Sequence, residues 1–280
     1  MNILFCGDGN IADGVIISTL SLLKNTKDIL HIYLLTATVN YGSTYYKALP
    51  QEFADSLEDL VKEYNGENTV NLFDISELFS KEPPLANMAT RFTPCCMLRL
   101  YADIVEEIPD RVLYLDNDVI CRLNPEDFYN TDMKDAELVG VLDYYGSWFF
   151  QRQFFERNYM NSGVLLLNLE KIRQTGLFKK CRERCQDIEM FMPDQSAINK
   201  LAQKKLIAPR KYNEQRKLHK DTVFQHFTTS FRFFPWLHTV SVKPWNIEGM
   251  HNTLKLTEYD GILEEYLKIK QKMKAKGEVI

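Results

Sequence analysis

The 280-residue chain lacks any excess of basic residues. It has 34 Lys and Arg against 38 Asp and Glu, a formal net charge of −4 at pH 7. A general nucleic-acid binder would normally show a clear basic excess, so the composition argues against a nucleic-acid partner. Disorder is also disfavoured, because 45% of the residues are hydrophobic and can form a substantial core.

The chain also lacks the cysteine spacing of a metal site. None of its six cysteines forms a CxxC pair, and no His/Cys cluster completes a zinc site. They are Cys6, Cys95, Cys96, Cys121, Cys181 and Cys185. We expect reduced, buried thiols of a cytoplasmic protein.

Long apolar runs are missing as well. The opening segment, MNILFCGDGN, reads as a strand and has neither the basic start nor the apolar stretch of a signal peptide. No segment approaches the roughly 20 apolar residues of a membrane span. These features predict a cytoplasmic protein.

Short apolar runs alternate with helix-period segments along the chain. Strands are predicted at 2–6, 31–35, 70–73, 112–115, 138–142 and 163–169. Helices are predicted at 15–23, 53–64, 98–105, 194–203 and 257–274, and a long loop at 81–94. This alternation predicts an α/β fold with a mostly parallel central sheet flanked by helices. No linker divides the chain, so we treat 1–280 as one domain.

Polar residues after the strands matter most, because ligands of open parallel sheets bind beyond the carboxyl ends of the strands. The first strand runs into Gly7-Asp8-Gly9-Asn10, which is neither GxGxxG nor a Walker loop. Asp8 and Asn10 could read a base or ribose through hydrogen bonds. From this segment alone, a Gly/Asn turn with a helix cap is the preferred interpretation.

The sharpest feature is the strand 112–115, which leads directly into Asp116-Asn117-Asp118, a DXD motif. In extended backbone, carboxylates at i and i+2 point to the same side, and they repel each other unless a cation lies between them. Oxygen ligands select Mg²⁺ or Mn²⁺. His226, in another predicted strand, could complete a Mn²⁺ site, although a lone His is more often structural. An Asp/Asn turn remains the alternative for the DXD segment.

Other polar residues lie near the ends of predicted elements. Asp143 closes the run 138–142, and Asn161 opens the run 163–169. Asp194 and Gln195 start a predicted helix, where Asp194 could simply be the N-cap and Gln195 an exposed first-turn residue.

Taken in order, these pieces resemble family 8 glycosyltransferases, the group that contains bacterial lipopolysaccharide galactosyl- and glucosyltransferases and, more distantly, glycogenin. The resemblance covers residues 2 to 245. Its pieces are Asp8 and Asn10, Arg99 in MLRLYA, LYLDND ending at Asp118, Asp143, NSGVLLLN from Asn161, Asp194-Gln195, His226 and Lys243-Pro-Trp245.

The resemblance implies a Rossmann-like nucleotide-sugar fold of the GT-A type. It also implies a UDP-sugar donor carrying galactose or glucose, a saccharide or glycolipid acceptor, Mn²⁺ with Mg²⁺ as a substitute, and retention of anomeric configuration. Residues 1–120 would form the nucleotide-binding half, 121–245 the donor-sugar and acceptor half, and 246–280 a C-terminal helical extension.

The resemblance assigns roles by position. Asp8 and Asn10 would hold uridine, and Asp116, Asp118 and His226 would ligate the metal, with Asp116 and Asn117 also in the donor-binding set. Arg99, Asp143, Asn161 and Asp194 would hold the donor sugar. Gln195 would lie near the anomeric carbon and is, with Asp194, the catalytic candidate. Because an amide is a poor nucleophile, we expect same-face substitution rather than double displacement.

Two departures from the family pattern stand out. Family members commonly place the phosphate-binding lysine of a KPW motif at the offset from His226 that Arg232 occupies here, whereas Lys243 comes seventeen residues after His226. The segment 231–238 therefore looks like an insertion. We expect Lys243 to make the phosphate contact, with Arg232 as the rival. Ser162 stands where Ala is frequent, and we expect little effect from it.

Aromatic and basic segments suggest further contacts. Tyr144, Tyr145 and Trp148 could stack on an acceptor sugar, or the segment could be ordinary core under a loop. The C-terminal helix carries Lys268, Lys270, Lys272, Lys274 and Lys276, which could attach the protein to the inner face of a membrane. A solvated helix end is the preferred interpretation.

Two rival functions need weighing. A sugar-1-phosphate nucleotidyltransferase shares the fold class, but it should carry a basic loop after the first strand, and residues 7–14 contain no Lys or Arg. A non-catalytic nucleotide- or glycan-binding protein on the same scaffold should have lost a metal ligand, whereas Asp116, Asp118 and His226 are all present.

Overall fold

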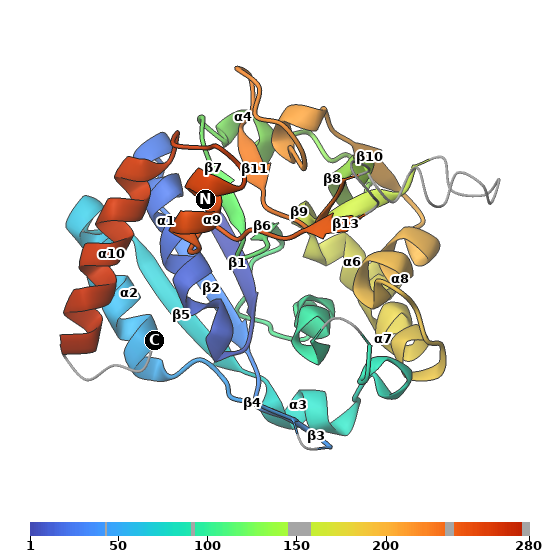
Figure 1. Cartoon of the computed structure of the whole chain (residues 1–280). Coiled ribbons are helices and arrows are strands. Elements are labelled where there is room, and N and C mark those ends of the chain that lie inside the picture. Colours follow the sequence, from blue (N-terminus) through green and yellow to red (C-terminus); the bar gives the residue numbers. More distant parts are fainter. Residues whose placement is uncertain (43, 91–92, 145–157, 233–237, 276–280) are drawn as a thin grey trace.

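The computed structural model describes residues 1–42, 44–90, 93–144, 158–232 and 238–275 (Figure 1). A seven-stranded sheet with the order β10-β8-β9-β6-β1-β2-β5 lies at its centre. The strands are β1 (Asn2–Gly7), β2 (His31–Thr36), β5 (Thr69–Asp74), β6 (Arg111–Leu115), β8 (Leu138–Leu142), β9 (Met160–Asn168) and β10 (Lys205–Ile207). The six strands predicted for this sheet are confirmed, and the strand predicted to hold His226 is β11 (Phe224–His226), outside the sheet.

The sheet is mostly parallel, as predicted, with one reversed strand. β1 runs parallel to β2 and β6, β2 to β5, and β8 to β10, whereas β9 runs antiparallel to both β6 and β8. The amino end of β9 therefore lies beside the carboxyl ends of its neighbours. This reversal brings residues near the start of β9 to the edge where ligands of such sheets bind.

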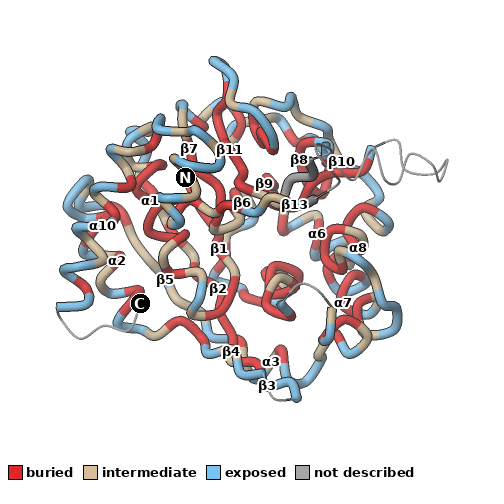
Figure 2. The backbone as a smooth tube through the Cα atoms, in the orientation of Figure 1, coloured by how far each residue is buried: buried red, intermediate tan, exposed pale blue. Residues whose placement is uncertain are grey.

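Helices cover both faces of the sheet, which confirms the α/β prediction (Figure 1). One face packs against α1 (Ala12–Asn25), α2 (Gln51–Tyr64) and α10 (Asp260–Ala275), and the other against η3 (Pro94–Tyr101), α6 (Leu169–Thr175), α7 (Leu177–Asp187) and α8 (Pro193–Leu201). Side chains of a strand alternate between these layers: Ile3 and Phe5 belong to the first core and Leu4 to the second. Figure 2 shows the buried central strands and the exposed outer side of α10.

Smaller elements complete the fold. The antiparallel pairs are β3 (Val39–Tyr41) with β4 (Thr44–Tyr46), β7 (Val119–Cys121) with β11 (Phe224–His226), and β12 (Ser230–Arg232) with β13 (His238–Val240). The short helices are η1 (Gly9–Ile11), α3 (Ser76–Lys81), η2 (Leu85–Asn87), α4 (Glu126–Tyr129), η4 (Arg210–Tyr212) and α9 (Ile247–Asn252).

The predicted helix 98–105 is wrong in type and position. The structure has the 3-10 helix η3, which ends at Tyr101, and Ala102 N–H donates to the Arg99 carbonyl in an i to i−3 bond. Over two turns, apolar spacing does not separate a period of 3.0 residues from one of 3.6. The predicted loop 81–94 also contains the single turn η2.

The cysteines, the division of the chain and membrane-spanning segments were also subjects of prediction. All six cysteines are free, and Cys95, Cys121, Cys181 and Cys185 are buried. The division of the chain at 120 and 245 stays a prediction. Within the described residues, no helix combines the length and apolarity that crossing a bilayer requires.

Candidate active site at the carboxyl edge of the sheet

The DXD segment is a turn, not extended strand. β6 ends at Leu115, β7 begins at Val119, and Val119 N–H donates to the Asp116 carbonyl at 3.1 Å. The expectation that Asp116 and Asp118 share a side because of extended backbone is therefore wrong. Their carboxylates converge because the chain turns sharply between two strands that belong to different sheets.

His226 meets the two aspartates from β11. Its Nε2 lies 3.2 Å from Asp118 Oδ1 and 3.6 Å from Asp116 Oδ2, and the three side chains bring one ligand atom each within 4.8 Å of one another. Two carboxylate oxygens and one imidazole nitrogen suit a divalent cation such as Mn²⁺. The residues present therefore fit the expected metal.

Two glycines make this close arrangement sterically feasible. A Cβ on Gly163, in β9, would stand 2.2 Å from His226 Cε1 and 2.8 Å from Asp116 Oδ2. A Cβ on Gly14, in the first turn of α1, would stand 2.2 Å from the Asn117 carbonyl oxygen. The turn is thus packed between α1 and β9 at distances that only glycine allows.

Cations balance the two acids of the turn. Lys243 Nζ contacts Asp118 Oδ2, and Arg99 Nη2 donates to Asp116 Oδ1 at 2.9 Å. Burial alone would raise the pKa of Asp118, but Lys243 and His226 outweigh it and hold that pKa well below its usual range. Burial alone would lower the pKa of His226, but Asp118 and Asp116 raise it.

A hairpin of β12 and β13 lies in the segment that is expected to be an insertion before Lys243. β12 and β13 pair with each other, and together with the residues between them they span 230–240. Removing those eleven residues would move Lys243 to the position of Arg232. The side chain of Lys243 lies at Asp118 and also donates to the Phe227 carbonyl at 3.0 Å. The side chain of Arg232 lies outside the described part of the structure.

The predicted sugar-binding residues form a second, connected cluster beside the first. Gln195 Nε2 donates to Asp143 Oδ2 at 2.9 Å, and Asn161 Nδ2 donates to the same oxygen at 3.1 Å. Asp194 Oδ2 lies 3.2 Å from Arg99 Nε. These five residues are all buried. Arg99 touches both Asp116 and Asp194, so it joins the two clusters.

Two alternative interpretations of the sequence are wrong: Asp194 as a helix N-cap, and Gln195 as an exposed first-turn residue. The residue at the N-cap of α8 is Met192, so Asp194 is not the cap. Gln195 is 4% exposed, so it is not a solvated first-turn residue. Pro193 starts the helix one position earlier, which turns both side chains toward β9.

The segment after β1 has the predicted cap. Asp8 Oδ1 accepts from Asn10 N–H at 3.1 Å and Asp8 Oδ2 from Asn10 Nδ2 at 3.1 Å, so Asp8 caps η1. Asp8 is buried, whereas Asn10 is exposed. The segment lies at the same sheet edge as the DXD turn, because α1 begins directly after it and packs on Asn117 through Gly14.

Three contributors were missed or undervalued in the sequence. Tyr114 donates its hydroxyl to Asp116 Oδ1 at 2.5 Å. The Ser162 hydroxyl reaches Asp194 at 3.2 Å and Gln195 at 3.3 Å, so this departure lies inside the site. Asn213 Oδ1 faces His226 Nδ1 at 3.2 Å. Asn213 follows a short 3-10 turn far from the DXD motif, and no sequence pattern singles it out.

The acceptor and membrane expectations remain predictions. Tyr144 is 50% exposed, and the Arg216 guanidinium stacks on its ring at 4.2 Å. Tyr145 and Trp148 lie outside the described residues, as does Lys276. In α10, Lys270 pairs with Asp13 at 2.6 Å. The remaining described lysines of the expected patch are exposed: Lys268, Lys272 and Lys274.

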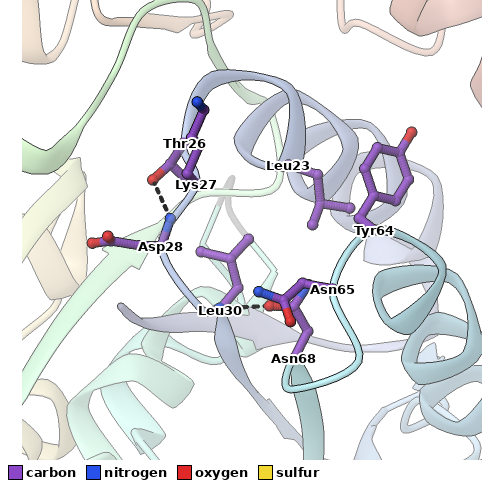
Figure 3. A pocket seen from close by; sticks show the side chains of 8 residues that line it. All are labelled: Leu23, Thr26, Lys27, Asp28, Leu30, Tyr64, Asn65 and Asn68. Carbon is purple, nitrogen blue, oxygen red and sulfur yellow. Dashed lines mark hydrogen bonds between the residues drawn. The ribbon is translucent and has the colours of Figure 1, made fainter.

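A pocket of about 270 Å³, shown from close by in Figure 3, lies beside the amino ends of β2 and β5. It is lined by Leu23, Thr26, Lys27, Asp28, Leu30, Tyr64, Asn65 and Asn68. Asn68 Oδ1 accepts from Leu30 N–H at 2.8 Å, next to the amino ends of β2 and β5. The pocket is therefore remote from the carboxyl edge, where the acidic cluster lies.

Comparison with known proteins shows the family of the chain. The pattern of glycosyl transferase family 8 matches residues 2–249, and the chain belongs to this family. It is 26% identical over 267 residues to a lipopolysaccharide 1,3-galactosyltransferase of Salmonella typhimurium, covering 89% of this chain and 74% of the relative. It is also 26% identical over 257 residues to a lipopolysaccharide 1,2-glucosyltransferase of Escherichia coli, covering 82% and 71%.

A third relative matches over a shorter stretch. Glycosyltransferase GlyA of Streptococcus pneumoniae is 32% identical over 106 residues, which is 37% of this chain and 14% of that protein. Among solved structures, the galactosyltransferase LgtC in complex with donor and acceptor sugar analogues superposes with a TM-score of 0.63 at 20% identity, covering 94% of this chain and all of that one. This likeness confirms the GT-A fold.

Proposed function

We propose that the protein is a retaining hexosyltransferase that moves galactose or glucose from a UDP-sugar to a saccharide or glycolipid acceptor with Mn²⁺. The observation that carries the proposal is the convergence of Asp116, Asp118 and His226 beside Lys243. A bound cation there would neutralise the charge that develops on the leaving diphosphate. Family membership supports glycosyl transfer as the reaction.

The surrounding residues have distinct tasks in this proposal. Lys243 lies beside the metal ligand Asp118 and can turn its ammonium toward a diphosphate oxygen. Asp8 and Asn10 would bind uridine at the start of α1. Arg99 would orient Asp116 and Asp194, because its guanidinium is already committed to both carboxylates. Asp143 and Asn161 would bind hydroxyl groups of the donor sugar.

Contacts around Gln195 favour same-face substitution. Its amide oxygen accepts from Ser162 N–H at 3.0 Å, and its amide nitrogen donates to Asp143. The neighbouring Asp194 carboxylate is engaged by Arg99 and the Ser162 hydroxyl. Neither group is poised as a free nucleophile. The acceptor oxygen therefore bonds to the anomeric carbon on the face from which UDP leaves, the bond between that carbon and the diphosphate oxygen breaks, and the acceptor proton passes to the departing diphosphate. A trapped glycosyl adduct on Gln195 or Asp194 would contradict this step.

UDP release from a panel of UDP-sugars, with and without Mn²⁺, tests the proposal. We expect one donor to be hydrolysed, with activity that requires both the metal and Asp118 and is lost in Asp118→Ala. Asp135→Ala is the control, because Asp135 is an exposed acid paired with Lys204 before β8. Absence of UDP release from every donor, without metal-dependent UDP binding, would contradict the proposal and favour a nucleotidyltransferase or a non-catalytic binding protein.

Membrane attachment through α10 is a separate part of the proposal. Exposed Lys268, Lys272 and Lys274 could meet anionic headgroups. The apolar side of α10, including Ile269 and Met273, instead packs on the core. Any membrane contact would therefore be electrostatic, and co-sedimentation with anionic vesicles should disappear at high salt.

A further inference from the structure

A chain of buried side chains runs from the metal site to the sugar site. Asn213, which is 1% exposed, stands between His226 and Asn161. Its Oδ1 lies 3.2 Å from His226 Nδ1, and its Nδ2 donates to Asn161 Oδ1 at 2.9 Å. Asn161 in turn contacts Asp143 at 3.1 Å. The direction of each hydrogen bond in this chain can be worked out from its sugar-site end.

The sugar-site end of the chain is chemically unambiguous. The Gly163 backbone N–H can only donate, and it donates to Asn161 Oδ1 at 2.9 Å. The Asp143 carboxylate accepts from Asn161 Nδ2 at the other end of the same amide. The orientation of the Asn161 amide is therefore determined, which matters because amide oxygen and nitrogen are otherwise assigned only from their partners.

The orientation of Asn161 determines that of Asn213. Because Asn161 Oδ1 is an acceptor, the Asn213 atom facing it must be the amide nitrogen, and Asn213 Oδ1 must face His226. An amide oxygen only accepts, so His226 Nδ1 must carry a hydrogen. In the neutral ring the lone pair is then on Nε2, the atom that faces Asp118 and Asp116.

We propose that Asn213 is a positioning residue that holds His226 in the tautomer and orientation required for metal binding through Nε2. This inference rests on the proposed metal-dependent function. Partners of this kind for a ligating His typically change metal affinity by about 10–100-fold when removed. The same amide also holds Asn161, so Asn213 links the metal ligands to the donor-sugar residues.

The tautomer can be measured in the wild-type protein without metal. Long-range ¹H–¹⁵N NMR of the His226 ring, assigned with His226→Gln, should show a protonated Nδ1 at a pH where the ring is neutral. A neutral ring protonated on Nε2 instead would overturn the inference. This measurement remains decisive if the protein binds no Mn²⁺, a result that would defeat the proposed function alone.

Mn²⁺ affinity gives the second test, measured from the EPR signal of free Mn²⁺ in the presence of UDP. Asn213→Leu should weaken binding by about 10–100-fold. Asn213→Asp should restore part of the loss, because a carboxylate still accepts from Nδ1–H. The control is Asn68→Leu, since Asn68 is equally buried and hydrogen-bonded but lies at the opposite edge (Figure 3). Wild-type affinity in Asn213→Leu would overturn the inference.

Discussion

Two buried acids at opposite edges of the sheet are held in different ways. Glu137, at the amino end of β8, accepts from the backbone N–H groups of Gln203 and Lys204 at 2.6 and 3.1 Å, and from the Thr175 hydroxyl. Asp118, at the carboxyl edge, is held by the side chains of His226 and Lys243. Both acids are almost fully buried, at 1% and 6% exposure.

We infer that the difference separates a structural acid, Glu137, from the proposed metal ligand Asp118. Backbone N–H groups cannot leave Glu137 without unfolding the local structure. The partners of Asp118 are side chains that can rotate away when a cation or phosphate arrives. Burial alone therefore does not identify a site, whereas exchangeable partners at the ligand-binding edge do.

Neutralising each acid in turn separates the two, and the largest expected effect on activity is at Asp118. Asp118→Asn should lower metal-dependent UDP release by about 10²–10³-fold, because a ligand of the charge-stabilising cation is lost. Glu137→Gln should lower the free energy of unfolding by about 1–3 kcal/mol, through weaker hydrogen bonds to its buried partners. Its activity per folded molecule should stay at the wild-type level. Donor hydrolysis assays and urea titrations measure the two quantities, and a loss of activity in Glu137→Gln would break the comparison.

Two buried arginines extend the comparison to cations. Arg99 pairs with Asp116 and Asp194, whereas Arg182, in α7, pairs with Asp103 at 2.6 Å. Replacing either by Met leaves a buried acid without its cation and should cost about 3–5 kcal/mol of stability.

Activity should distinguish the two arginine variants. Only Arg99→Met should reduce UDP release per folded molecule, since only its acids belong to the site. Thermal unfolding and activity at equal folded concentration provide the measurement. Equal loss of activity in Arg182→Met would show that the assay reports stability rather than the site.

A glycine pair tests the packing at the metal site. Gly163→Ala would push a methyl group into His226 and should weaken Mn²⁺ binding while costing about 1–3 kcal/mol of stability by overpacking. Gly261→Ala meets no atom within 4 Å in the exposed first turn of α10 and should stabilise the protein by up to about 1 kcal/mol. Calorimetry with and without Mn²⁺ measures the stability and the Mn²⁺ affinity of both variants. Unchanged Mn²⁺ affinity in Gly163→Ala would mean that His226 has room to shift.

The smallest expected effect is on the pH dependence of stability, through Glu265, which is remote from the site. Burial alone would raise the pKa of Glu265, but hydrogen bonds from Lys24 and Tyr64 lower it below its usual 4.5. Because the folded-state pKa is lowered, this contribution is fully present above about pH 4.5 and is lost as the pH falls through the lower value.

Glu265→Gln should therefore flatten the acid limb of the stability curve by at most about 1 kcal/mol, the usual limit for an exposed pair. The exposed neighbour provides the control, as Glu264→Gln should leave that limb unchanged. Urea unfolding between pH 3 and pH 6 measures the acid limb of each variant. An identical acid limb in wild type and Glu265→Gln would contradict the role of this pair.

The sequence alone determined the layered α/β fold and most of the candidate site. Apolar runs and their periods predict the strands and flanking helices, because alternation and helical spacing are local properties of the chain. The ordered motifs from Asp8 to Lys243 indicated the family.

Only the tertiary structure decided how those residues meet. The reversal of β9, the turn that brings Asp116 to Asp118, and the hairpin that returns Lys243 to the site all depend on contacts between distant segments. Asn213 belongs to the same class, because its role follows from hydrogen bonds to His226 and Asn161, which are remote from it in sequence. Local patterns carry no information about such partners, since the direction of a hydrogen bond is defined only when both groups are in place.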